Sequence, residues 1–154
     1  MTRRSRATSR ARAAATPAAP DVQAKRLASA LQALAKGLPN PWDESTDYFH
    51  SFAAAMPADT ELTPESVRQA LGIGARYQVV LSSADSRLGR ITEADWGADI
   101  AGGFRQLHTV MRATLDNRSI AFARGKGVVR VRVWLFGRTE DGTLVGLRSI
   151  STET

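Results

Sequence analysis

The stretch VRVRVWLF, residues 129–136, sets the expected architecture of this chain. Its odd-numbered positions are Val or Leu, whereas its even-numbered positions are Arg, Trp or Phe. Because successive side chains of a strand point to opposite faces, this alternation predicts a strand with one aliphatic and one mixed face. Asp141-Gly142 is a hairpin signal, so residues 143–151 are predicted to return as a second strand. With a further strand at 120–123 and a turn at 124–127, the C-terminal part is expected to form an antiparallel sheet.

Three helices are predicted upstream of this sheet. The longest follows Trp96, where apolar residues recur at steps of three and four along one face: Ile100, Phe104, Leu107, Met111 and Leu115. Gly102-Gly103 either weakens this helix or marks a close packing contact. A shorter helix starts at the N-cap Thr63 and stops at Gly72. The first helix runs from an N-cap at Asp21 to Lys36.

Two more strands are expected between the helices, at residues 48–56 and 77–81. Residues 82–90 have no clear periodicity and are expected to be irregular. The predicted order is α, β, α, β, α, β, β, β. This order favours an α+β sandwich with an antiparallel C-terminal sheet.

The 154 residues suit one domain, and the net charge of +6 is unevenly placed along them. Residues 1–26 carry a net +6, residues 40–99 a net −6 and residues 100–154 a net +5. Residues 1–20 contain no aliphatic residue larger than Ala after Met1, so they are predicted to be a disordered basic leader ahead of a domain at 21–154. The leader could act as an electrostatic tether to nucleic acid.

Nothing in the sequence carries a recognisable catalytic or metal-binding signature. There is no Cys, and His50 and His108 pair with no nucleophile at a motif spacing. Both are expected to be structural or surface residues. The chain is therefore predicted to be a non-enzyme with no cofactor and no metal of its own. The absence of Cys and of an apolar run long enough to cross a membrane suits a cytoplasmic protein.

Three segments look exposed and rich in acidic or hydroxyl groups. They are Asp43-Glu44-Ser45, between Trp42 and Tyr48; residues 92–96, which carry Asp95 and Trp96; and residues 151–154, which follow a strand directly. A carboxylate and a hydroxyl at one fixed tip form an oxygen cluster that suits a cation or an arginine.

The sequence resembles the nuclease A inhibitor-like proteins from about Trp42 to Thr154. The resemblance is clearest in TEADW, residues 92–96, and in VRVWLFGRTEDG, residues 131–142. It continues through Val145-Gly146-Leu147 to the final Glu153-Thr154. It implies an α-β-α sandwich of the pathogenesis-related-protein-1-like type with a mainly antiparallel sheet.

The resemblance also implies a function, which is to plug the active site of a metal-dependent, sugar-nonspecific DNA/RNA nuclease. By this resemblance Glu44 would engage a nuclease arginine, Trp96 would lie in the interface, and Thr154 would approach the nuclease-bound metal through water. Asp43, Asp95 and Glu153 adjoin these three residues and complete the expected partner-binding set. The alternative is a nucleic-acid-associated or adaptor protein tethered through the Arg-rich leader, with inhibition lost.

Overall fold

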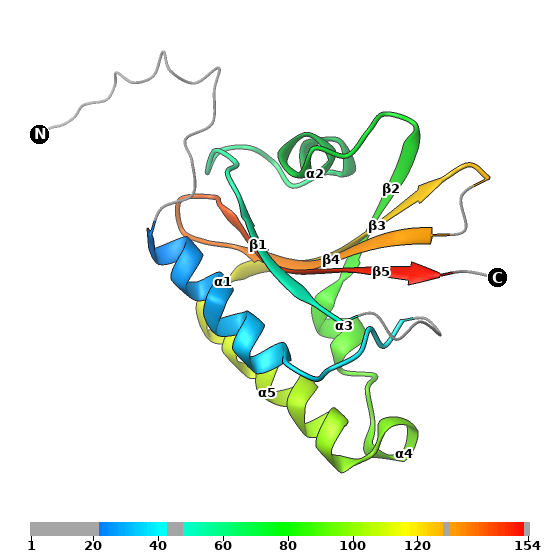
Figure 1. Cartoon of the computed structure of the whole chain (residues 1–154). Helices are drawn as coiled ribbons and strands as arrows, with labels where there is room; N and C mark the ends of the chain where they lie inside the picture. Colours follow the sequence, from blue (N-terminus) through cyan, green and yellow to red (C-terminus); the bar gives the residue numbers. More distant parts are fainter. Residues whose placement is uncertain (1–21, 43–47, 128–129, 153–154) are drawn as a thin grey trace, which may run out of the picture.

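The computed structural model describes residues 22–42, 48–127 and 130–152, which form an α+β domain (Figure 1). Its helices are α1 (Val22–Ala35), α2 (Pro64–Leu71), α3 (Ala84–Leu88), α4 (Glu93–Trp96) and α5 (Ala98–Thr114). Its strands are β1 (His50–Ala54), β2 (Tyr77–Ser83), β3 (Asp116–Gly125), β4 (Arg130–Arg138) and β5 (Leu144–Thr152). The predicted N-cap Asp21 and the leader at 1–20 lie outside the described residues.

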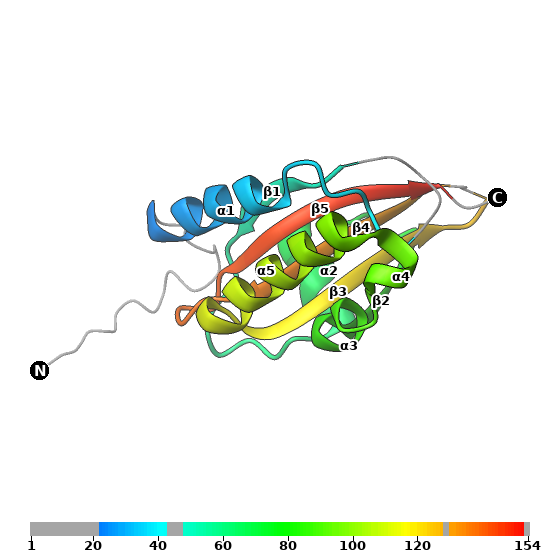
Figure 2. The ribbon, with the colours of Figure 1, turned by 90° about the horizontal axis from the view of Figure 1, so that it is seen from below.

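The strands form one antiparallel sheet in the order β1-β5-β4-β3-β2. Helices α1 and α5 lie on one face of the sheet and α2 on the other, which gives the three layers of an α-β-α sandwich (Figures 1 and 2). The α+β prediction is therefore confirmed.

The alternation in β4 explains how the sheet joins the two helical layers. Val131, Val133 and Leu135 are buried in the core under α1 and α5. On the opposite face, Trp134 and Phe136 belong to a second core together with residues of α2. Burial of both faces makes β4 the central element of the fold, because each face removes apolar area from water.

The prediction that residues 82–90 are irregular was wrong, because α3 occupies Ala84–Leu88. The helix begins where the Ser83 hydroxyl accepts a hydrogen bond from the Ser86 backbone N–H at 3.1 Å. Five residues are too few to show a helical stripe, which is why periodicity missed this element. Residues 93–96 likewise form the short helix α4.

Two contacts of α1 and the loop after it explain how the helical layer is held. A Cβ added to Gly103 of α5 would lie 2.7 Å from the Leu38 Cδ2 atom, so this glycine marks a close packing contact, whereas Gly102 meets only the end of the Arg105 side chain. At the sheet edge, the Gln32 amide donates to the Phe49 carbonyl at 2.8 Å and accepts from the Ser51 N–H. These two bonds tie α1 to the backbone at the start of the edge strand β1.

The strand register brings several segments to one end of the sheet. His50 of β1 pairs with Arg148 of β5, and Arg130 of β4 pairs with Thr152. The start of β1, the end of β5 and the β3–β4 connection therefore lie at the same end. Helix α1 begins at the opposite end, as both views of the molecule show (Figures 1 and 2).

Candidate partner-binding site

Helix α4 presents two of the predicted site residues, Asp95 and Trp96. The Thr92 hydroxyl caps this helix by accepting from the Asp95 N–H at 3.3 Å and donating to the Asp95 carboxylate at 3.0 Å. Asp95 is exposed and Trp96 is partly exposed. Gly97 follows with φ +86°, a left-handed conformation that a glycine adopts without strain and that separates α4 from α5. The cap at Thr92 and the turn at Gly97 fix both ends of α4 and therefore the position of Trp96.

Trp96 lines a small hollow that we call the Trp96 hollow. It has a volume of about 110 Å³ and is lined by Pro41, Trp42, Arg87, Arg90, Ile91 and Trp96. Trp42 is anchored by edge-to-face contacts with Phe49 and Phe122, at ring-centroid distances of 6.2 and 6.5 Å. Trp42 directly precedes Asp43 in the sequence, so the hollow joins α4 to the start of the predicted acidic segment.

The walls of the Trp96 hollow are basic, a feature that the sequence analysis missed. The Arg87 guanidinium lies 4.9 Å from the Phe122 ring centroid and donates to the Ser82 hydroxyl at 3.0 Å, while Arg90 is exposed. Arg87 belongs to α3, and Arg90 follows it by two residues. These arginines meet Trp42 and Trp96 only through contacts between segments that are distant in the sequence, so no local pattern pointed to the hollow.

Four predicted site residues lie outside the described residues: Asp43, Glu44, Glu153 and Thr154. The segments that flank them are described. The chain re-enters at Tyr48, which forms an isolated antiparallel bridge with Pro39, and β5 runs to Thr152 at the same end of the sheet. The register thus brings the two flanking segments to one end of the molecule.

An ion-pair cluster at Asp85 fastens α3 to the rest of the fold. The Asp85 carboxylate accepts from Arg118 at 2.8 and 3.0 Å and contacts the His108 Nε2 atom at 2.7 Å. The bonds from Arg118, helped by His108, hold the pKa of the Asp85 carboxyl well below its usual range despite partial burial. His108 thus has the structural role that the sequence analysis predicted. The cluster positions the helix that carries Arg87.

We expect Asp85→Asn to destabilise the protein at neutral pH and less so in acid. The pKa of Asp85 is lowered by folding, so its ionised form contributes stability above the unfolded pKa of about 4, and that contribution is lost as the pH falls below it. Urea unfolding at pH 7 and at pH 3 measures the difference. Asp59→Asn, at an exposed residue of the loop after β1, is the matched control. A difference from wild type that is equal at both pH values would contradict the assignment.

Potential metal-ligating side chains do not gather in the described part of the chain. Within it, no group of three or more His, Cys, Asp or Glu side chains could hold a metal ion. In the same residues no helix is long and apolar enough to span a membrane.

Comparison with known proteins identifies the family. The family model described as nuclease A inhibitor-like protein matches residues 25–154, which span α1 from its fourth residue, all later elements and the chain end. No curated protein matches the chain. Because the match covers most of the sequence, including the predicted site segments, this chain belongs to the nuclease A inhibitor-like family.

Proposed function

We propose that the protein inhibits a metal-dependent, sugar-nonspecific DNA/RNA nuclease by binding over its active site, and that it acts in the cytoplasm by binding and not by catalysis. Family membership indicates nuclease inhibition in general. The observation that carries the finer proposal is the Trp96 hollow, where Trp96 of α4 meets Trp42 next to Asp43. Tryptophan is a frequent anchor of protein interfaces.

The proposed interface combines two kinds of charge. Oxygen atoms of Asp43, Glu44, Glu153 and Thr154 would imitate the phosphate oxygens that a nuclease binds with arginine and a divalent cation. Arg87 and Arg90 would instead donate hydrogen bonds to a carboxylate of the partner beside Trp96. Such mixed complementarity fixes the register of two proteins more strictly than one sign of charge does.

Binding to the nuclease is the step that the first experiment measures. A purified nuclease of this class is titrated with the full chain, and association is followed by calorimetry without nucleic acid. We expect Glu44→Ala, Trp96→Ala and deletion of Thr154 each to weaken binding by roughly 10- to 100-fold, the effect of losing an interface anchor worth about 1.5–3 kcal/mol.

Glu140→Ala is the matched control for Glu44→Ala. Glu140 is exposed and lies in the turn between β4 and β5, at the end of the sheet away from the Trp96 hollow. It is expected to leave affinity unchanged. Equal losses for the two glutamate variants, or no association with any such nuclease at micromolar concentration, would refute the proposal. Unfolding curves of all variants separate lost binding from lost folding.

A further inference from the structure

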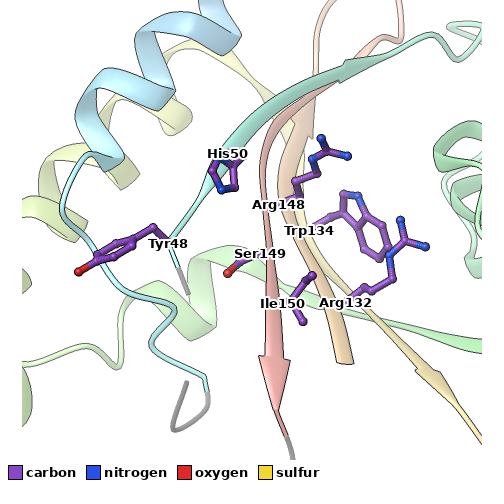
Figure 3. A pocket seen from close by; sticks show the side chains of 7 residues that line it. All are labelled: Tyr48, His50, Arg132, Trp134, Arg148, Ser149 and Ile150. Carbon is purple, nitrogen blue, oxygen red and sulfur yellow. The ribbon is translucent and has the colours of Figure 1, made fainter. Parts of the chain in front are cut away.

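The face of the sheet that carries α2 is only partly covered. Near the end of β5, a row across β1, β5 and β4 brings His50, Arg148 and Trp134 together on that face. Arg132 lies two residues before Trp134 on the same face. Figure 3 shows the two arginines and the Trp134 indole gathered on one side of β4 and β5, with His50 beside them. These residues line a hollow of about 270 Å³, which we call the Arg132–Arg148 hollow.

The floor of this hollow fixes one guanidinium in place. The Arg132 Cζ atom lies 4.8 Å from the centroid of the Trp134 ring, a cation–π contact. Trp134 is only 3% exposed, so it serves as a buried support beneath Arg132. Arg132 itself is partly exposed, so a ligand can reach it from solution.

The positive charge of the hollow has no internal counterion in the described structure. Arg132 and Arg148 form no ion pair with a carboxylate of the described residues, and no acidic residue lines the hollow. Arg148 and His50 are exposed, and Arg130 extends the basic face by one more row. An anionic ligand would therefore relieve repulsion between the guanidinium groups, and it would break no ion pair between residues that the structure describes.

We propose that the Arg132–Arg148 hollow binds single-stranded nucleic acid. Guanidinium groups donate two parallel hydrogen bonds to a phosphate, and a guanidinium plane can also stack on a base. Arg132, supported by Trp134, provides the plane, and Arg148 provides a second phosphate contact. The Arg132 guanidinium that Trp134 supports offers a plane on which a base can stack. This feature favours nucleic acid over an acidic peptide, because a carboxylate has no base to stack.

The Arg132–Arg148 hollow lies on a different face of the sheet from the Trp96 hollow, although Tyr48 and Ile150 place it near the segments that carry Glu44 and Thr154. The Trp96 hollow includes residues of α3 and α4 on the α5 side, whereas the Arg132–Arg148 hollow opens on the α2 face. Nucleic-acid binding by the inhibitor would also imitate inhibition in an activity assay, because it would sequester the substrate. The calorimetric measurement without nucleic acid tests the inhibitory proposal independently of this one.

The test is fluorescence anisotropy of a labelled oligothymidylate with the full chain over a range of salt concentrations. The paired change Arg132→Gln/Arg148→Gln is compared with Arg105→Gln/Arg112→Gln, two exposed residues of α5. Both variants lose the same charge. We expect the first to bind about tenfold more weakly and to reduce the slope of log affinity against log salt by about 1.4, since each phosphate contact contributes about 0.7. The second is expected to keep the wild-type slope.

Equal losses in the two paired variants would overturn the proposal, because binding would then depend on net charge alone and on the basic leader. Competition by polyglutamate as strong as that by unlabelled oligothymidylate would also overturn it, in favour of an acidic peptide. Arg148→Gln alone provides a second measurement if the double variant unfolds, because Arg148 is exposed. It is expected to lower the slope by about 0.7.

Discussion

Replacing Gly146 with alanine is expected to destabilise the fold by about 4 kcal/mol or more, at the extreme of single substitutions. A Cβ at this position would overlap the Leu135 carbonyl oxygen and would lie 2.7 Å from the Phe136 Cα atom. Both are backbone atoms of the neighbouring central strand, so no side chain can turn away to make room. Chemical unfolding measures the loss, which we expect to leave little or no native protein.

Gly102→Ala is the matched control, since it adds the same methyl group. In α5 a Cβ on Gly102 would meet only the Arg105 side chain, at 3.9 Å. Alanine loses less backbone entropy in a helix than glycine, so this variant is expected to gain about 0.5–1 kcal/mol of stability. If Gly146→Ala unfolded at the same denaturant concentration as wild type, the close approach of β4 and β5 would be wrong.

Removal of the Arg138 guanidinium is expected to have the next largest effect, about 3 kcal/mol of lost stability for Arg138→Met. This buried guanidinium donates to three backbone carbonyls, those of Pro57 at 2.8 Å, Thr60 at 2.6 Å and Gly142 at 3.2 Å. Methionine fills similar space but leaves these oxygens without their donor. Urea unfolding measures the difference in the free energy of unfolding, with the same dependence on urea concentration used for both proteins.

Two variants separate the hydrogen bonds of Arg138 from its charge. Arg138→Lys retains the charge but lacks the planar fork, so we expect an intermediate loss. Arg105→Met removes an exposed arginine of α5 and is expected to change stability by at most about 0.5 kcal/mol. If lysine restored full stability, charge and not the set of three bonds would be responsible.

The main elements of the fold could be predicted because their patterns are local. The alternation at 129–136 predicted a strand with two different faces, and the structure buries the aliphatic face of β4 under α1 and α5. The apolar stripe after Trp96 predicted α5, whose Phe104, Leu107 and Met111 are buried. Each signal needs only the repeat of a strand or a helix.

What sequence reasoning missed depends on contacts between distant residues. Helix α3 is held by Asp85, whose partners His108 and Arg118 are 23 and 33 residues away. The Trp96 hollow forms only when α3 and α4 come together beside Trp42. The Arg132–Arg148 hollow depends on the β4–β5 register and on how far α2 extends over the sheet, neither of which periodicity encodes.

The opposite positions of the start of α1 and the end of β5 have a practical consequence for handling the protein. A surface linkage or fluorescent fusion attached ahead of Val22 would lie at the end of the molecule opposite to α4 and the end of β5 (Figures 1 and 2). The same attachment after Thr154 would crowd the proposed interface. We therefore expect immobilisation through the N-terminal side to leave the proposed interface accessible to a partner nuclease.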